Sequence, residues 1–422
     1  CIVVLCSVGV SVGIYLSADA IASFYNKPIA SALQIMALSA PFMAVCWVFV
    51  SAIRALRIVL YGVYVMSVAG PLILLVGGVV VGWAELGLAG VAWVQLAMAV
   101  GISLLAAYYF QRFFSIRACF EHVRRPARLR EMAHFSFPVM VTDLLYAVLT
   151  QLDVLMLGFF VSAEMVGVYA LARRIASAML KAPQAFDPIF SSVVSELAVS
   201  GRYGELGARF RVLFRWILTI NLPIFVSLLI VGDQLLTLIG GDKMQALPEV
   251  EIAAGLLVLF ILSVSMMLQG SFALAEPLLA MAGRPYLNFL NNGTWLCTNF
   301  VLNIVFIHFY TMGIVGAACG ALLSTLCVNA LRLGQIYRQY AIWPFDLKQA
   351  KPLFAAAIAS LVGVALRDSI GEPAAAVVVA LGAFVCVYGV GLGMMGVEEE
   401  DRKLVTKAVR WVGSRLGCRV DR

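Results

Sequence analysis

The sequence predicts an all-α polytopic membrane protein with about 12 transmembrane helices. Hydrophobic residues make up 63% of its 422 residues and charged residues only 13%, about half the charged share of an ordinary soluble domain. The mean hydropathy is +0.97. Apolar runs of about 20 residues, long enough to cross a bilayer, follow one another between short polar breaks, and none alternates as the strands of a barrel do. No stretch remains for a sizeable soluble domain.

We read the apolar runs as spans in chain order. Four precede a basic segment, at 1–17, 30–53, 58–82 and 88–111. Eight follow it, at 133–158, 166–193, 212–232, 250–275, 289–309, 313–333, 352–367 and 374–396. The chain starts inside an apolar run at Cys1, without the basic region or cleavage site of a signal peptide. We therefore expect a fragment of a longer membrane protein.

Lysine and arginine are unevenly distributed over the predicted loops. One alternating set of loops, together with the C-terminal tail, holds 24 of the 30 basic residues, whereas the other loops hold three. This count treats Arg215 and Arg332 as loop residues. Cytoplasmic loops are enriched in basic residues, so the first set and the tail are predicted to be cytoplasmic. The formal charge of +7 then reflects topology, and nucleic-acid binding is excluded.

Charged side chains interrupt two neighbouring spans, 133–158 and 166–193. The first carries Asp143 and Asp153, and the second carries Arg173, Arg174 and Lys181. A charge at the bilayer centre costs roughly 2.5 to 3.5 kcal/mol on insertion scales, so such groups usually face a partner or a water-filled cavity. The two arginines sit about 12 Å along their span at 1.5 Å per residue, well inside the hydrocarbon core. We predict a functional site here.

Several motifs resemble a known family. The segments FSFPVM, DVLMLGFF and VGVYALARRI are similar to the seventh and eighth helices of polysaccharide flippases, which belong to the multidrug/oligosaccharidyl-lipid/polysaccharide exporter superfamily. KAPQAFDPIFSSVVSEL, LALSAPFMAV and LLAMAGRP also resemble stretches of that family. The resemblance implies two six-helix bundles in a V around a central cavity, often with two additional C-terminal helices. It also implies that the first two helices of the family are missing from this chain.

The resemblance and the loop pattern together suggest a domain organisation. We expect an N-terminal bundle of four helices over 1–111, a basic cytoplasmic linker over 112–132 and a six-helix C-terminal bundle over 133–333. Two additional helices then occupy 334–396, and a basic cytoplasmic tail occupies 397–422.

The candidate substrate-binding residues are those that could line the implied cavity: Arg173, Arg174, Lys181, Asp143, Asp153, Asn292, Asn299 and Asn303. A guanidinium can hold a phosphate or carboxylate with two hydrogen bonds. The alternative is a structural pair in which either arginine neutralises Asp143 or Asp153. Asn288, Asn292, Asn299 and Asn303 share one helix face within about 60°. Their amides could contact sugar hydroxyls or bond between helices.

Other chemistries find little support. The three histidines are dispersed and the nine cysteines form no C-x-x-C pair, so no metal site or catalytic centre is predicted. No phosphate-binding loop of the type G-x-x-x-x-G-K-[ST] occurs, which argues against direct ATP use. We expect no cofactor, although Asp143 or Asp153 could bind a coupling proton or sodium ion.

The resemblance implies a flippase that moves a lipid-linked oligosaccharide, an O-antigen or exopolysaccharide unit, across the bacterial inner membrane by alternating access. Its partners would be that lipid-linked oligosaccharide, membrane lipids and glycan-assembly proteins. A drug or cation antiporter of the same superfamily is the first alternative. A membrane glycan polymerase or ligase is the second, but the longest predicted outward loop, about 232–249, contains no set of catalytic residues.

Overall fold

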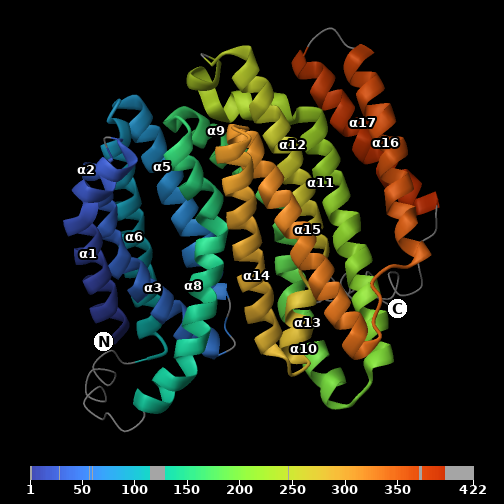
Figure 1. Cartoon of the computed structure of the whole chain (residues 1–422), viewed down its shortest axis with the longest axis horizontal. Helices are drawn as coiled ribbons and strands as arrows, with labels where there is room; N and C mark the ends of the chain where they lie inside the picture. The colour runs from blue at the N-terminus through green and yellow to red at the C-terminus, as the bar shows by residue number, and fades with distance from the viewer. Residues whose placement is uncertain are drawn as a thin grey trace. The chain divides into compact units, whose positions relative to one another are not determined.

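The computed structural model describes residues 2–27, 29–56, 58, 60–114, 129–245, 247–369 and 373–394 (Figure 1). All regular secondary structure in these ranges is helical. The chain divides into two compact units, Cys1–Phe137 and Pro138–Arg422. Most of the predicted basic linker and the whole predicted tail lie outside the described residues, and the predicted domain boundaries stay predictions.

The first unit contains the four predicted N-terminal spans. They correspond to α1 (Ile2–Tyr25), α2 with α3 (Ala30–Ala37, Ser39–Ala55), α4 with η1 and α5 (Leu60–Val63, Tyr64–Ala69, Gly70–Trp83) and α6 (Gly87–Gln111). The break between α2 and α3 has a local cause. Pro41 has no N–H to donate to the carbonyl of Ala37, and the Ser11 hydroxyl of α1 donates to that carbonyl instead, at 2.6 Å.

The interior of the first unit is held together by apolar packing. Its buried cluster contains Cys46, Val50, Val65, Met98, Ile102 and Ala106. The buried polar side chains in the described part of this unit are Ser11, Ser39 and Ser103. Each of these hydroxyls donates to a backbone carbonyl: Ser11 to Ala37, Ser39 to Met36, and Ser103 to Phe42.

The second unit contains the remaining predicted spans. Its helices are α8 (Leu129–Phe160, which begins in the first unit), α9 (Ala163–Ala176), η3 (Ser177–Leu180), α10 (Lys181–Val199), α11 (Tyr203–Gln245), α12 (Glu249–Ser271), α13 (Ala275–Met281), α14 (Pro285–Asn303), η4 (Ile304–Phe309), α15 (Gly313–Tyr340), η5 (Leu347–Gln349), α16 (Ala350–Ser369) and α17 (Pro373–Met394). The predicted span 166–193 is divided because Pro183 cannot donate to Met179, and the chain tightens into the 3₁₀ turn η3 just before it.

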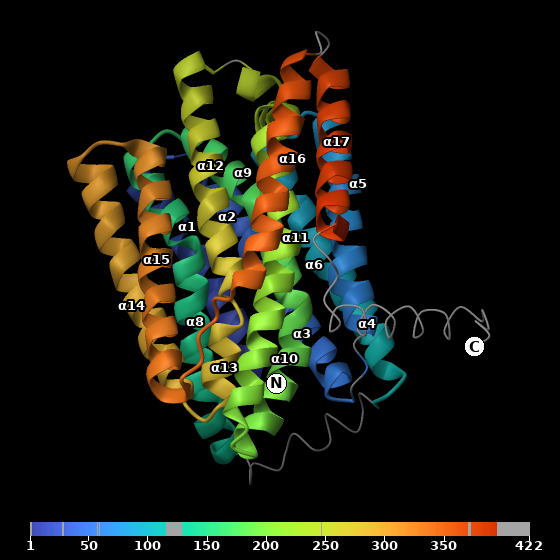
Figure 2. The ribbon, with the colours of Figure 1, turned by 90° about the vertical axis from the view of Figure 1, so that its right-hand side faces the viewer.

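Helix α12 lies in the middle of the second unit and packs against α9, α11 and α15. Helix α14 pairs with α15, and α16 pairs with α17; both pairs lie side by side in the two views of the ribbon (Figures 1 and 2). Helices α16 and α17 also pack on α11, around the buried Phe384 and Tyr388. The largest buried cluster lies around Leu157, Tyr169, Met179 and Val258.

Eight helical stretches among the described residues are long and apolar enough to cross a membrane, and two shorter ones, Leu144–Phe160 and Val379–Met394, are apolar. The chain is thus an all-helical, multi-pass membrane protein. The twelve predicted spans each coincide with helices. Eight of them overlap the candidate spans and two overlap the shorter apolar helices, whereas 166–193 and 289–309 overlap neither. These two carry most of the polar candidate residues, which lower their hydropathy.

The assignment of Arg215 and Arg332 to loops was wrong. Both residues already lie just inside predicted spans, 212–232 and 313–333, although the count placed them with the loops. In the structure Arg215 lies within α11 and Arg332 within α15, and both are buried. In sequence, a basic residue near the end of an apolar run is read as belonging to a cytoplasmic loop. The sequence does not show which helices pack together, so it cannot show that such a residue is buried between them.

Candidate functional site

Asp153 is the centre of a buried polar network in the second unit. It lies on α8 with 6% of its surface exposed. Its carboxylate accepts a hydrogen bond from the Tyr169 hydroxyl of α9 at 2.9 Å and one from the Asn303 amide of α14 at 2.8 Å. A buried carboxylate requires such donors, because an unpaired charge in a low-dielectric interior is strongly destabilising. Three helices are therefore linked at this residue.

The network continues along α14. The Asn303 amide also donates to Asn299 at 3.1 Å, and Asn299 donates to the Ser324 hydroxyl of α15 at 3.2 Å. The predicted stripe of four asparagines faces the interior of the unit, and all four residues are buried. In this structure their amides bond between helices. The role of Asn292, Asn299 and Asn303 in sugar binding stays a prediction.

Arg173 lies on α9 one turn after Tyr169, within electrostatic range of that residue. It is half-buried, and its Nη1 atom has no hydrogen-bond partner among the described residues. Neither it nor Arg174 is bonded to Asp153, whose partners in the described part of the chain are Tyr169 and Asn303. The structural pair with Asp153 that the sequence allowed is not formed here. The side chain of Asp143 lies outside the described residues.

The other two predicted basic residues are exposed on the surface of the unit. Arg174 is exposed on α9. Lys181 is exposed at the start of α10, where its ammonium group donates to Gln184 at 3.5 Å. Together with the half-buried Arg173 they are three basic residues along the α9–η3–α10 stretch.

A second buried network was missed by the sequence analysis. The Arg332 guanidinium of α15 pairs with the Glu276 carboxylate of α13 at 3.2 Å and donates to Asn292 of α14 at 2.8 Å. The Asn292 amide lies 3.5 Å from the same carboxylate, and the Asn288 amide donates to the Glu276 backbone at 2.8 Å. Only 4% of the Arg332 side chain is exposed, against 37% for Glu276. Three helices converge on this ion pair.

Tyr146 lies near the Glu276–Arg332 pair. It lies on α8, two turns before Asp153, and is within electrostatic range of Glu276, Arg332 and Arg173. Tyr146 and Asp153 are seven residues apart on α8, so the sequence places them on one helix face. Glu276 had no such signal, because it lies in a short helix between two spans. No cluster of three or more metal-ligating side chains occurs in the described ranges.

Residues 1–247, more than half of the chain, match the family model described as "Polysaccharide biosynthesis protein". The chain belongs to this family. The match includes Asp153 and the basic residues of α9, whereas the Glu276–Arg332 network of this polysaccharide biosynthesis protein lies beyond it.

One curated relative is the probable flippase AglR of Haloferax volcanii, which is 30% identical over 175 residues. That alignment covers 41% of this chain and 35% of the relative, so the chain spans about a third of that protein's length. The relative and the family model agree with the resemblance that the sequence motifs indicated.

Two solved structures define the fold. The lipid II flippase MurJ in an inward closed conformation superposes with a TM-score of 0.71 at 13% identity, covering 95% of this chain and 82% of that one. A mutant of the Vibrio cholerae MATE transporter VcmN gives a TM-score of 0.56 at 18% identity, covering 80% and 78%. The polysaccharide biosynthesis protein therefore shares its fold with these two structures.

Proposed function

We propose that this polysaccharide biosynthesis protein is a flippase for a lipid-linked oligosaccharide. The unit of an O-antigen or exopolysaccharide would be moved from the cytoplasmic to the periplasmic leaflet of a bacterial inner membrane. The family description, the flippase names of one curated relative and one solved structure, and the uneven distribution of basic residues support this proposal. The C-terminal tail is then cytoplasmic.

The observation that carries the proposal is the charge of α9. Arg173 and Arg174 are adjacent on a helix in a membrane protein, and in the described part of the chain Asp153 bonds to Tyr169 and Asn303 instead of to them. A lipid-linked oligosaccharide carries a phosphate or pyrophosphate at its lipid end. Arginine binds such groups with two parallel charge-assisted hydrogen bonds, and a half-buried site strengthens them. Lys181, about two turns further on, adds a third positive charge.

Transport then proceeds by alternating access, in which the site opens in turn to each leaflet. No ATP-binding loop is present in the sequence, so an ion gradient is the proposed energy source. Asp153 is the residue that we propose for coupling to a proton or sodium ion, because its carboxylate is surrounded by amide and hydroxyl groups, including a buried Asn303 Oδ1 atom without a partner in the described residues. Asp153→Asn should make transport independent of the gradient; unchanged ion dependence would contradict this role.

The proposal is tested in cells that need the full-length protein for surface glycan. Arg173→Ala and Arg174→Ala should abolish the glycan while membrane insertion, measured by immunoblotting of membranes, is unchanged. Arg202→Ala is the matched control, since it removes an exposed arginine that pairs with Glu205 and should leave the glycan normal. Normal glycan in both test variants would refute the role of the two arginines.

A drug or cation antiporter remains the second candidate, because the fold is shared with a MATE transporter and Asp153 is a buried acid. The two candidate functions differ in the sign of the charge on the transported molecule. An antiporter of cations should be inactivated by Asp153→Asn and be indifferent to Arg173→Ala in an ethidium efflux assay, whereas the flippase requires the arginine and does not move ethidium.

A further inference from the structure

Helix α11 contains a proline inside it, Pro223, and the helices α16 and α17 pack beside it. Because proline has no N–H, the Thr219 carbonyl one turn earlier has lost its usual donor within the helix. The Tyr388 hydroxyl of α17 donates to that carbonyl at 2.9 Å. The hydrogen bond that α11 lacks at this point is therefore supplied by another helix.

The direction of the Tyr388 hydroxyl is fixed by packing. The residue is only 6% exposed, and its ring is stacked on that of Phe384, with 5.8 Å between the ring centroids and 13° between the ring planes. A hydroxyl that is buried among apolar side chains needs an acceptor. The Thr219 carbonyl is that acceptor, so the tyrosine and the carbonyl each satisfy the other.

The pair of helices α16 and α17 contacts α11 on both sides of Pro223. Their common buried cluster contains two residues of α11 from before the proline and two from after it, which are Leu218, Leu222, Val226 and Ile230. Helix α16 comes especially close beyond the proline, where a Cβ atom added at Gly363 would lie 3.1 Å from the Ile230 Cδ1 atom. The pair therefore bridges the break in the hydrogen bonding of α11.

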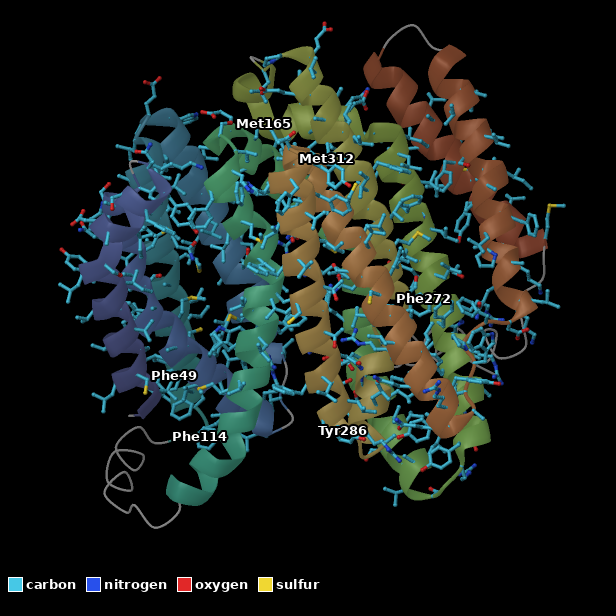
Figure 3. All side chains as sticks on the ribbon, viewed as in Figure 1. Phe49, Phe114, Met165, Phe272, Tyr286 and Met312 are labelled. Carbon is cyan, nitrogen blue, oxygen red and sulfur yellow. The ribbon has the colours of Figure 1, made fainter. Side chains whose placement is uncertain are left out.

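The first part of α11 is anchored independently of this pair. The ring of Phe214 lies 5.2 Å from that of Phe272 at the end of α12, which is labelled in Figure 3. The ring of Phe210, one turn earlier, lies 5.9 Å from that of Phe190 of α10. Bending at Pro223 would thus move the later part of α11 relative to a fixed beginning.

On the side of α12 the same turn is packed but not hydrogen-bonded. Asn221 is 0% exposed, and neither its Nδ2 nor its Oδ1 atom has a hydrogen-bond partner in the described part of the chain. A Cβ atom at Gly270 of α12 would lie 2.8 Å from that Nδ2 atom. Unpaired buried amides are destabilising, so this turn of α11 depends on the bond from Tyr388.

We infer that Pro223 is a hinge in α11 and that α16 and α17 control its bending through the hydrogen bond from Tyr388 to Thr219. With the bond formed, the two parts of α11 move together. When it breaks, the carbonyl is unpaired and α11 bends at the proline, the usual site of a kink in a helix. The inference concerns a conformational device and is independent of the transported molecule.

The test is hydrogen–deuterium exchange of the purified full chain, measured by mass spectrometry on peptides that cover residues 217–228. Tyr388→Phe removes only the hydroxyl. A hydrogen bond between membrane helices shifts an equilibrium by about threefold on average, and amides exchange when the local structure opens. Exchange over 217–228 should therefore rise by about threefold. Tyr340→Phe is the matched control, because its hydroxyl donates to the Ala282 carbonyl at 3.2 Å, and it should leave this exchange unchanged.

Pro223→Ala separates the hinge from simple packing of α17. Alanine restores an N–H one turn after Thr219, so exchange over 217–228 should be slower than in the wild type. Adding Tyr388→Phe to this variant should then have no further effect, because both substitutions act on the same carbonyl. Thermal unfolding serves to confirm that each variant is folded. An equal rise of exchange in both backgrounds, an equal rise in Tyr340→Phe, or no rise in Tyr388→Phe would overturn the inference.

Discussion

The two units differ in what they bury. In the described part of the first unit the buried polar groups are three serine hydroxyls, each donating to a backbone carbonyl. The second unit buries Asp153, Arg215, Arg332 and a stripe of asparagines. A serine hydroxyl needs only one carbonyl acceptor, within its own helix region for Ser39 or on a neighbouring helix for Ser11 and Ser103, whereas buried charges need partners from several helices. The first unit is therefore stabilised mainly by apolar packing. The second is stabilised also by polar networks, which depend on the exact positions of its helices.

This difference predicts unequal sensitivity to mutation. The largest effect should come from Glu276→Ala, which leaves the buried Arg332 guanidinium without its carboxylate. Breaking such a pair costs roughly 3 to 5 kcal/mol, and the 37% exposure of Glu276 places the expected loss at the lower end. The measurement is the free energy of unfolding in detergent.

A double variant sharpens this first test. Glu276→Leu combined with Arg332→Met removes both charges and should recover most of the lost stability, because apolar replacement of a whole buried pair is often neutral. If the single variant were as stable as the wild type, the second unit would not depend on this ion pair, and the contrast with the first unit would lose its main support.

The second-largest loss of stability is expected from a substitution beside the Asp153 network that changes no charged residue. A Cβ atom added at Gly320 would lie 2.7 Å from Asn303 Oδ1, so Gly320→Ala must move the amide that bonds to Asp153. We expect a loss of about 2 kcal/mol, as in other overpacked sites. Gly334→Ala on the same helix has no atom within 4 Å and should be neutral or slightly stabilising. Equal stability of the two variants would contradict the importance of the network.

The smallest effect is expected in the first unit. Ser103→Ala removes a hydroxyl that donates to the Phe42 carbonyl between α6 and α3. Hydrogen bonds between membrane helices contribute about 0.6 kcal/mol on average, so the free energy of unfolding should fall by less than about 1 kcal/mol. A loss comparable to that of Glu276→Ala would show that the first unit also depends on a polar contact, and the comparison would fail.

Much of the helical framework could be predicted from sequence, because apolar runs of bilayer length are a strong signal. The helix breaks at Leu38 and at Ser177–Leu180 follow from Pro41 and Pro183, which the sequence shows directly as residues that lack a backbone N–H. The polar networks were harder to predict from the sequence. The sequence indicated Asp153 and the asparagine stripe, but Tyr169, Glu276 and Arg332 join them from other helices. Such partners depend on which helices pack together, and one sequence does not contain that information directly.

The most direct test of the role of α9 is flipping of an anionic lipid-linked oligosaccharide by the full-length protein reconstituted in vesicles. Arg173→Gln removes the charge but keeps an amide of similar length, and the loss of one charge-assisted contact should slow flipping by at least about tenfold. Arg202→Gln, outside the networks, should flip at the rate of the wild type. A rate for Arg173→Gln equal to that of Arg202→Gln would contradict the assignment of this arginine to the anionic cargo.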